Sequence, residues 1–245
     1  MRKDGETSMV EADSGKLLQT VFIRHGQSEW NEANRFTGWA DIDLSESGIK
    51  EASSAGAMLK RLGYYFDLAF TSYLKRAIKT LHIVLEENEQ LWLPEHKSWM
   101  LNERHYGALQ GLDKDKAVRQ FGAEQVRLWR RGYDEPVPPV SAIDPRFPGN
   151  DAAYRHISVS ELPKGETLKD TEARVVRYWL SCIAPEIRKG KRVLVVAHGN
   201  SLRALIKHIE NLTPYDIMSV EPATGKPLVY EFTADLQPIR SSYLK

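Results

Sequence analysis

The stretch VFIRHGQSEWNEANRFTGW, residues 21–39, begins as an apolar run and changes abruptly at His25, which stands between an arginine and a glycine. A second stretch, RVLVVAHGNSLRALI at residues 192–206, follows the same order and brings its apolar run to His198 and another glycine. Short continuous apolar runs are typical of strands that are buried on both faces of a parallel sheet. Two such runs that each end in His-Gly predict that two imidazoles meet at one site.

Predicted strands and helices alternate along the chain. We expect strands at 17–23, 67–71, 192–197 and 228–233, the last being the final strand, and helices at 49–62, 74–85, 176–187 and 201–210. This alternation predicts an α/β fold of three layers, with a mainly parallel central sheet flanked by helices. We expect residues 1–16 to form a flexible N-terminal extension and residues 17–245 to form a single domain. Ligands bind outside the carboxyl ends of the strands in such sheets, where both histidines are placed.

Two helix starts carry capping residues. Ser45 precedes the helix expected around 49–62, and its hydroxyl suits an N-cap. Thr167 and Asp170 resemble a capping box ahead of the helix expected around 176–187, although Glu or Gln is preferred at the second position. These local signals strengthen the helical prediction for both segments.

The composition excludes some partners and compartments. The 245 residues include 34 Lys and Arg against 33 Asp and Glu, so the net charge of +1 provides no general attraction for nucleic acid or a membrane surface. No run of 18 apolar residues offers a membrane span. The single cysteine, Cys182, cannot form an intrachain disulfide, which indicates a reducing compartment, and we expect a cytoplasmic protein. Cys182 is expected to pack within a helix rather than to act as a nucleophile.

The tripeptide at the end of the first apolar run suits phosphate chemistry. Arg24 offers a planar fork of donors, His25 can act as a nucleophile or as an acid or base near neutral pH, and Gly26 lets the backbone approach a ligand. The small polar residues and glycines that follow suit an oxyanion cradle. The alternative is a structural turn, and the second His-Gly junction favours the functional interpretation. The amides at the start of the helix after His198 are expected to face an anion.

Other candidates come from segments without regular periodicity. LNERHYGALQG, residues 101–111, places Glu103 among basic, aromatic and glycine residues, where it could serve as general acid or base. Arg76 follows a predicted strand and could reach the strand-end site. For both residues the alternative is an ordinary solvated charge, and the same holds for three further basic candidates: Lys114, Arg130 and Arg131. The sequence has no metal-binding motif, so phosphate charge would be met by basic side chains and backbone amides.

The segment between Gly132 and Gly165 is rich in proline and cannot hold a regular helix. A connection of this length in a compact domain is often a lid or a binding loop, and the alternative is a surface excursion.

Six segments together resemble the cofactor-dependent phosphoglycerate mutases of the histidine phosphatase superfamily: RHGQSEWN, FTGWADIDLSESG, TSYLKRAIKTL, LNERHYGALQG, WRRGYDEPVPP and VVAHGNSLRALI. The likeness runs in order from residue 17 to the C-terminal region. RHG alone marks only the superfamily, whereas LNERHYG with WRRGYDEPVPP is more specific to the mutase branch. Gln27 departs from the pattern, because many members of the family carry Glu there.

The resemblance implies a catalytic centre in which His25 is the phosphorylated nucleophile and Glu103 donates and accepts the proton. His198 would stabilise the transferring phosphoryl group together with Arg24 and Arg76. The cofactor and substrate would be bound by Ser28, Asn31, Thr37, Gly38, Arg104, Tyr106, Lys114, Arg130, Arg131, Gly199 and Asn200.

The resemblance also implies an activity and its partners. The enzyme would interconvert 3-phosphoglycerate and 2-phosphoglycerate through phospho-His25, primed by 2,3-bisphosphoglycerate and without a metal, and would form a homodimer or homotetramer. Water must be kept from a phosphohistidine. We expect the 132–165 segment and the C-terminal tail to exclude it.

Three other functions compete with this one. A phosphatase on the same fold would use His25 but release phosphate to water; the LNERHYG run and the long 132–165 segment favour the mutase. A bisphosphoglycerate mutase differs in its balance of activities, and Ser28 resembles the glycolytic mutases, where the synthase branch tends to carry glycine. An inactive relative that binds phosphoproteins would usually lack the nucleophilic histidine, which is present here.

Overall fold

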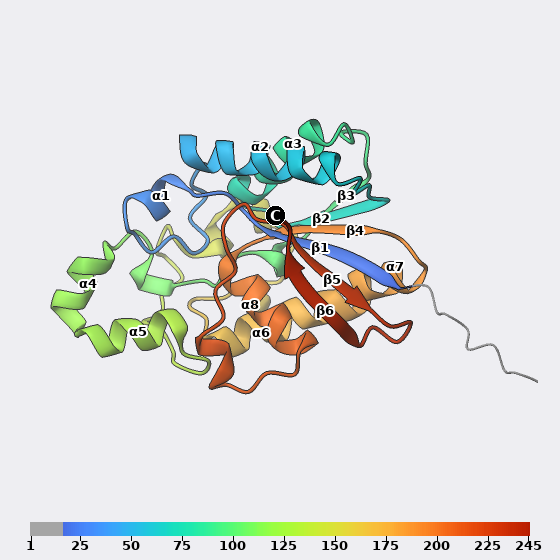
Figure 1. Ribbon diagram of the computed structural model, residues 1–245. Coiled ribbons are helices and arrows are strands. Elements are labelled where there is room, and N and C mark those ends of the chain that lie inside the picture. The colour runs from blue at the N-terminus through green and yellow to red at the C-terminus, as the bar shows by residue number, and fades with distance from the viewer. Residues whose placement is uncertain (1–16) are drawn as a thin grey trace, which may run out of the picture.

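A six-stranded sheet forms the centre of the protein in the computed structural model, which describes residues 17–245. The expected extension at 1–16 lies outside the described residues. The strands are β1 (Leu18–Arg24), β2 (Leu68–Thr71), β3 (Glu95–Lys97), β4 (Val193–Ala197), β5 (Leu228–Phe232) and β6 (Pro238–Tyr243). They lie in the order β3-β2-β4-β1-β5-β6 (Figure 1). The first four are parallel and the last two are antiparallel, so the prediction of a mainly parallel α/β sheet is confirmed.

The register of β1 and β4 brings the two histidines together. Arg24, the last residue of β1, pairs with Ala197, the last residue of β4. The next residue in each strand is the histidine, and the backbone N–H of His25 donates to the carbonyl of Ala197 at 2.9 Å. Both imidazoles therefore leave the same edge of the sheet from neighbouring strands.

Helices cover both faces of the sheet, as Figure 1 shows. One face packs against α2 (Glu46–Arg61) and α3 (Lys75–Glu87), and the other packs against α6 (Leu168–Tyr178), α7 (Ala184–Arg188) and α8 (Gly199–Ile209). Successive strand residues alternate between these layers: Val21 and Ile23 belong to the first core and Phe22 to the second. This explains the unbroken apolar runs of β1 and β4, because every side chain along them is buried by one layer or the other.

Three further helices lie outside this sandwich. They are α1 (Glu29–Glu32), α4 (Lys114–Phe121) and α5 (Ala123–Arg131). In Figure 1 they lie beyond the carboxyl ends of β1 and β4. Short 3-10 turns occur at Trp99–Leu101, Gly107–Leu109, Pro148–Asn150, Ala152–Tyr154, Val159–Glu161 and Asp216–Met218. The proline-rich 132–165 segment contains three of these turns and no α-helix, as expected.

Both predicted N-caps are confirmed. The Ser45 hydroxyl accepts the backbone N–H of Gly48 at 3.2 Å, and Thr167 and Asp170 form the reciprocal capping box. The sequence marks one face of α2 by Ile49, Ala52, Leu59 and Leu62; Ala52 and Leu59 are buried as expected, whereas Ile49 and Leu62 are 48% and 45% exposed. Small residues take the buried positions instead, because α2 approaches the backbone beside the histidine: a Cβ on Gly48 would lie 2.0 Å from the carbonyl oxygen of Gln27.

Several elements differ from the sequence prediction. The strand at Leu228–Phe232 is not the last, because the chain returns as β6 along its outer side. The short edge strand β3 and the helices α4 and α5 were not predicted. The helix expected at 176–187 is interrupted by a π-helical segment, Trp179–Ile183, which carries the half-buried Cys182 and is followed directly by α7, whose second residue is a proline.

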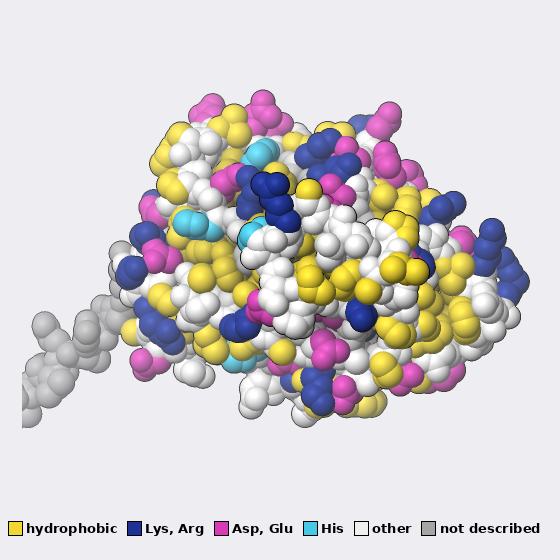
Figure 2. All heavy atoms as spheres, turned by 180° about the vertical axis from the view of Figure 1, so that it is seen from behind, with side chains coloured by type: hydrophobic (Ala, Val, Ile, Leu, Met, Phe, Trp, Pro, Cys, Tyr) yellow, Lys and Arg dark blue, Asp and Glu magenta, His cyan; other side chains and the backbone are white. Residues whose placement is uncertain are grey.

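Two surface properties follow the composition. Acidic and basic side chains are interspersed over the face seen in Figure 2. Within residues 17–245, no helix is long and apolar enough to cross a membrane.

Candidate active site

His25 and His198 form a buried pair at the sheet edge. Their ring centroids are 4.9 Å apart and their planes are inclined by 62°. The exposed fractions are 3% for His25 and 0% for His198. The two His-Gly junctions noticed in the sequence therefore do meet at one place.

The hydrogen bonds of His25 define which of its nitrogens can react. Nδ1 lies 2.6 Å from the carbonyl oxygen of Gly26, so it carries the proton and donates it. Nε2 accepts a hydrogen bond from Nε of Arg76 at 3.2 Å, so it holds the lone pair. Burial, together with the charges of Arg76 and Arg24, lowers the pKa of His25 well below 6.5. The imidazole is therefore neutral at physiological pH, with a nucleophilic Nε2.

Arg76 is fixed by three acceptors rather than solvated. Its NH1 donates to the carbonyl of Ala40 at 2.9 Å and its NH2 to that of Gly38 at 2.7 Å, while its Nε faces His25. The side chain is 1% exposed, and burial lowers its pKa to about 10, which leaves it charged. Gly38 has a φ of +55°, and a Cβ there would collide with the Gln110 side chain at 2.2 Å. Glycine thus permits the turn that presents its carbonyl to Arg76.

His198 is neutral and held from one side. Its Nε2 lies 2.7 Å from the hydroxyl of Ser72. Its Nδ1 is buried without a hydrogen-bond partner within the described residues. Burial and then the positive charges nearby, that of Arg76 first, lower its pKa well below 6.5. Ser72 was not selected from the sequence, where a serine after a short strand carries no distinctive signal.

Glu103 receives two backbone N–H groups on one oxygen. Its Oε1 accepts from Arg104 at 2.8 Å and from Asn200, in the first turn of α8, at 3.0 Å. This helix start was expected to face a ligand anion, and in the structure the N–H of Asn200 binds a protein carboxylate. A Cβ on Gly199 would lie 3.7 Å from Oε2 of Glu103 and 3.4 Å from Nε of Arg24. The absence of that Cβ leaves room between the carboxylate and the arginine.

A buried ion pair, missed in the sequence, supports the loop that carries Glu103. Arg174 of α6 binds Glu166 through two hydrogen bonds of 2.7 and 2.8 Å, and both side chains are about 5% exposed. Arg174 also donates to the carbonyls of Met100, Asn102 and Glu103. The polar groups of Arg174 and Glu166 bond either to each other or to the backbone around Glu103. The ion pair therefore fixes the position of Glu103.

A basic pocket with an empty volume of about 600 Å³ is lined by residues that adjoin the two histidines in the chain. Its described lining contains six basic side chains: Arg24, Arg35, Lys114, Arg130, Arg131 and Arg203. Only two acidic side chains, Glu103 and Glu221, belong to the same lining. His25, His198 and Arg76 do not belong to this described lining, whereas Arg24 and Gly199, which stand next to the two histidines in the chain, do.

Most of the predicted binding residues line this pocket. They are Asn31, Thr37, Gly38, Tyr106, Lys114, Arg130, Arg131, Gly199 and Asn200. Three buried donors among the lining residues have no hydrogen-bond partner within residues 17–245: Nε of Arg24, the hydroxyl of Thr37 and Nε of Arg203. Unpartnered buried donors are costly, and a phosphate oxygen would satisfy them. The pocket therefore fits a phosphorylated ligand.

Ser28 and Arg104 do not line the pocket. Their side chains bond to the segments that surround it. The Ser28 hydroxyl accepts the backbone N–H of Asn31 at 3.2 Å and caps α1. Arg104 is fully buried, with its guanidinium carbon 4.6 Å from the ring centroid of Tyr106 and a hydrogen bond to the carbonyl of Trp129. Burial is the largest influence on Tyr106 and opposes its ionisation, but the charge of Arg104 together with the hydrogen bonds from Arg104 and Asn200 outweighs burial, so the pKa of this phenol lies below its usual value.

Arg203, Arg35 and Glu221 line the pocket and were not selected from the sequence. Arg203 is 2% exposed and donates to Asn200 and to the carbonyls of Arg131 and Ile217, each at 2.8 Å. An arginine inside the apolar run SLRALI was the available signal for it, since a buried charge needs such partners.

The structure gives no support to the expectation that the 132–165 segment excludes water from the pocket. None of its residues belongs to the pocket lining. Its apolar side chains, Phe147, Tyr154 and Leu162, pack against Trp39 and Trp99 instead. The segment thereby supports the loops around Gly38 and Glu103 from outside. The C-terminal tail is likewise absent from the described lining: Lys245 lies in an adjoining groove behind Glu221 and Pro222.

Comparison with known proteins agrees with this geometry. The family model of the histidine phosphatase superfamily (branch 1) matches residues 20–241. A mycobacterial glucosyl-3-phosphoglycerate phosphatase, in its complex with VO3, is similar in structure with a TM-score of 0.69 and 24% identity, covering 92% of this chain and 96% of that chain. A phosphoglycerate mutase from Bacillus anthracis has a TM-score of 0.64 and 20% identity, covering 94% of this chain and 93% of that chain. An alpha-ribazole phosphatase from Shigella flexneri has a TM-score of 0.65 and 21% identity, covering 88% of this chain and 91% of that chain.

Proposed function

The chain belongs to the histidine phosphatase superfamily, and from this premise we propose that it is a 2,3-bisphosphoglycerate-dependent phosphoglycerate mutase. It would interconvert 3-phosphoglycerate and 2-phosphoglycerate through a phosphohistidine at His25. The observation that carries the proposal is the second group of cations in the pocket. Lys114, Arg130, Arg131 and Arg203 come from α4, α5 and α8, separate from the loop of His25. A ligand with an anionic group at each end suits such a pocket.

The residues around His25 have distinct roles in this proposal. Nε2 of His25 attacks phosphorus while the bond from Nδ1–H to the Gly26 carbonyl keeps the ring oriented. The N–P bond forms as the P–O bond to the donor breaks. Arg76, Arg24 and His198 surround the phosphoryl group and stabilise its charge. These groups are already positioned, so little reorganisation is needed when the charge moves.

Glu103 would move the proton. Its Oε1 is held by two backbone N–H groups, which leaves Oε2 toward Arg24 and the open space at Gly199. From there it protonates the departing alkoxide and deprotonates the accepting hydroxyl in the reverse step. A positioned acid or base typically contributes about 10²- to 10⁴-fold to the rate.

Bound 2,3-bisphosphoglycerate supplies the phosphoryl group that charges His25. The unpartnered donors of Arg24 and Thr37 would hold one of its phosphates, and the cations of α4 and α5 would hold the other acidic groups. We place the activity in the cytoplasm, in keeping with the single free Cys182, with no nucleic acid or membrane partner.

A phosphatase is the second candidate. Two of the three similar solved structures described above are named phosphatases. The 132–165 segment also contributes no residue to the described pocket lining, which removes one argument for protection of phospho-His25 from water. In that case the chemistry at His25 is the same, and water takes the place of the accepting hydroxyl.

An enolase-coupled assay with 3-phosphoglycerate distinguishes the two activities. It is run with and without 2,3-bisphosphoglycerate, while free phosphate is followed in parallel. The mutase forms 2-phosphoglycerate in a reaction stimulated by the bisphosphate, with little free phosphate. Free phosphate without isomerisation would replace the mutase by the phosphatase.

The variant His25→Ala should lose both activities and the acid-labile phosphoenzyme. The exposed His208, in the last turn of α8, provides the control substitution His208→Ala. Full activity in His25→Ala would overturn the nucleophile assignment in either enzyme.

A further inference from the structure

Glu221 is an acidic residue in a pocket that otherwise collects positive charge. Its Oε2 lies 2.7 Å from NH2 of Arg131, and both residues belong to the pocket lining. The hydrogen bond to Arg131 and the charges of Arg131, Arg24 and Arg130 lower the pKa of Glu221, although burial opposes the shift. The carboxylate is therefore ionised at neutral pH and interacts electrostatically with three arginines of the pocket.

The backbone after Glu221 is attached to the catalytic centre. NH1 of Arg24 donates to the carbonyl of Pro222 at 2.9 Å, and the N–H of Gly225 donates to the carbonyl of Arg24 at 2.9 Å. The N–H of Ala223 donates to the hydroxyl of Tyr243 at 3.0 Å, so β6 also supports this segment. Although the Glu221 side chain is 58% exposed, its backbone cannot swing away from the pocket rim without breaking these bonds.

The geometry on the other side of the ion pair is equally constrained. Arg203 holds the carbonyl of Arg131 at the end of α5. The carboxylate of Glu221 and an anionic group of a ligand therefore compete for one guanidinium whose backbone is fixed.

We propose that Glu221 is a specificity-determining residue, an internal competitor that occupies Arg131 until the distal anionic group of the substrate displaces it. The inference rests on the proposed function, because it requires a ligand with a second anion. Glu221 weakens the binding of such a ligand through like-charge repulsion and through competition for Arg131. The same effect favours release of a product that carries several negative charges.

The test measures binding without turnover. Isothermal titration calorimetry follows 2,3-bisphosphoglycerate binding to His25→Ala enzyme and to the same enzyme with Glu221→Gln added. The loss of an exposed like charge should tighten binding about two- to fivefold, which is the range of exposed ion pairs. Glu221→Lys should tighten it further. The gain should shrink between about 0.05 and 0.5 M salt, because the screening length shortens.

Glu124→Gln is the matched control. Glu124 is an exposed carboxylate on α5 that pairs with Arg127 at 2.6 Å, but it is not part of the described pocket lining. Its removal changes the net charge equally and should leave the affinity unchanged. Unchanged or weaker binding in Glu221→Gln, or equal tightening in Glu124→Gln, overturns the role of Glu221. Failure of the parent His25→Ala enzyme to bind the bisphosphate overturns the substrate class of the proposed function and this inference with it.

Discussion

At the scale of the residue, the protein keeps three histidines buried and neutral. Burial lowers the pKa of His25 and His198 well below 6.5 and that of His105 to about 4. For His25 this is a chemical requirement, because a protonated imidazole has no lone pair with which to attack. The neighbouring cations Arg24 and Arg76 act in the same direction as burial. The groups that stabilise the phosphoryl charge thus also keep the nucleophile unprotonated.

This burial predicts that acidification below pH 6.5 destabilises the protein. In the unfolded chain each histidine has a pKa of about 6.5. Below that pH the unfolded state therefore binds more protons than the folded state, in which these imidazoles stay neutral. The stability contribution is complete above pH 6.5 and is lost as the pH falls toward each folded-state pKa. Each such histidine adds a slope of about 1.4 kcal/mol per pH unit. Urea unfolding between about pH 7.5 and 5.5 measures it.

The slope should decrease in His25→Ala and remain in the exposed variant His208→Ala. A free energy of unfolding that does not change between pH 6.5 and 5.5 would show that these rings are not held neutral.

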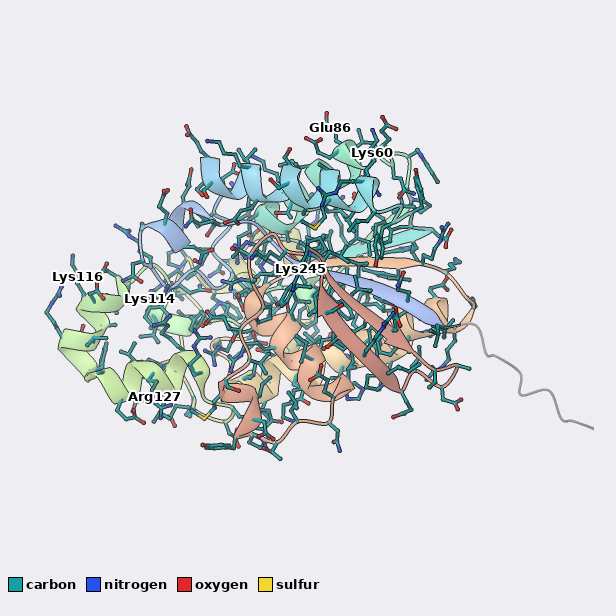
Figure 3. All side chains as sticks on the ribbon, in the orientation of Figure 1. Lys60, Glu86, Lys114, Lys116, Arg127 and Lys245 are labelled. Carbon is teal, nitrogen blue, oxygen red and sulfur yellow. The ribbon has the colours of Figure 1, made fainter. Side chains whose placement is uncertain are left out.

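At the scale of the element, α4 brings a cation into the pocket from a helix that projects away from the sheet. Ala117 of α4 packs in a small core with Phe36, Tyr106 and Trp129. Lys114 lines the pocket, and Figure 3 shows it on the side of α4 that faces the rest of the molecule, whereas Lys116 points outward. Burial, followed by the charge of Arg130, lowers the pKa of Lys114, as expected for an ammonium group in a basic pocket.

Substitution of these two lysines tests the second anion site. Lys114→Gln should raise the KM for 3-phosphoglycerate by about tenfold or more, because a hydrogen bond to a charged group contributes about 1.5–3 kcal/mol. Lys116→Gln is the control, since residues two apart on a helix face different directions. The measurement is the coupled assay over a range of substrate concentrations. Equal effects of the two substitutions would remove Lys114 from the binding site.

At the scale of the whole molecule, the sheet ends at a short open strand next to exposed apolar residues. β3 is three residues long and stands at the edge of the sheet. Leu91 and Trp92, just before it, are 60% and 72% exposed. Such residues beside an open edge suit contact with another chain. We propose that the homodimer or homotetramer implied by the resemblance forms through this edge.

Light scattering after size-exclusion chromatography tests this assembly. Trp92→Lys should convert the oligomer to monomers, whereas Tyr215→Lys, at a residue that is 83% exposed, should leave it intact. A monomeric wild-type protein would contradict the proposal.

Local rules explain why so much of the architecture was predictable. β4 and the Val21–Ile23 part of β1 are buried on both faces, so their side chains are apolar without interruption and the ends of these runs are visible in the sequence. Ser45 and Thr167 bond to backbone three residues away, which makes their capping roles a property of the local sequence. β3 was missed for the converse reason: the three residues EHK carry no apolar pattern, and only pairing with β2 makes them a strand.

The sequence by itself determined the fold class and the delivery of two histidines to one edge of the sheet, because parallel strands bring their carboxyl ends together. Only the tertiary structure decided what each charged residue does. Arg104 and Arg131 look alike in the chain, yet one is buried beneath Tyr106 and the other faces the pocket. Ser72 and Glu221 gain their roles from partners 126 and 90 residues away. Contacts over such separations depend on the order of the strands and the packing of the loops, which no local pattern encodes.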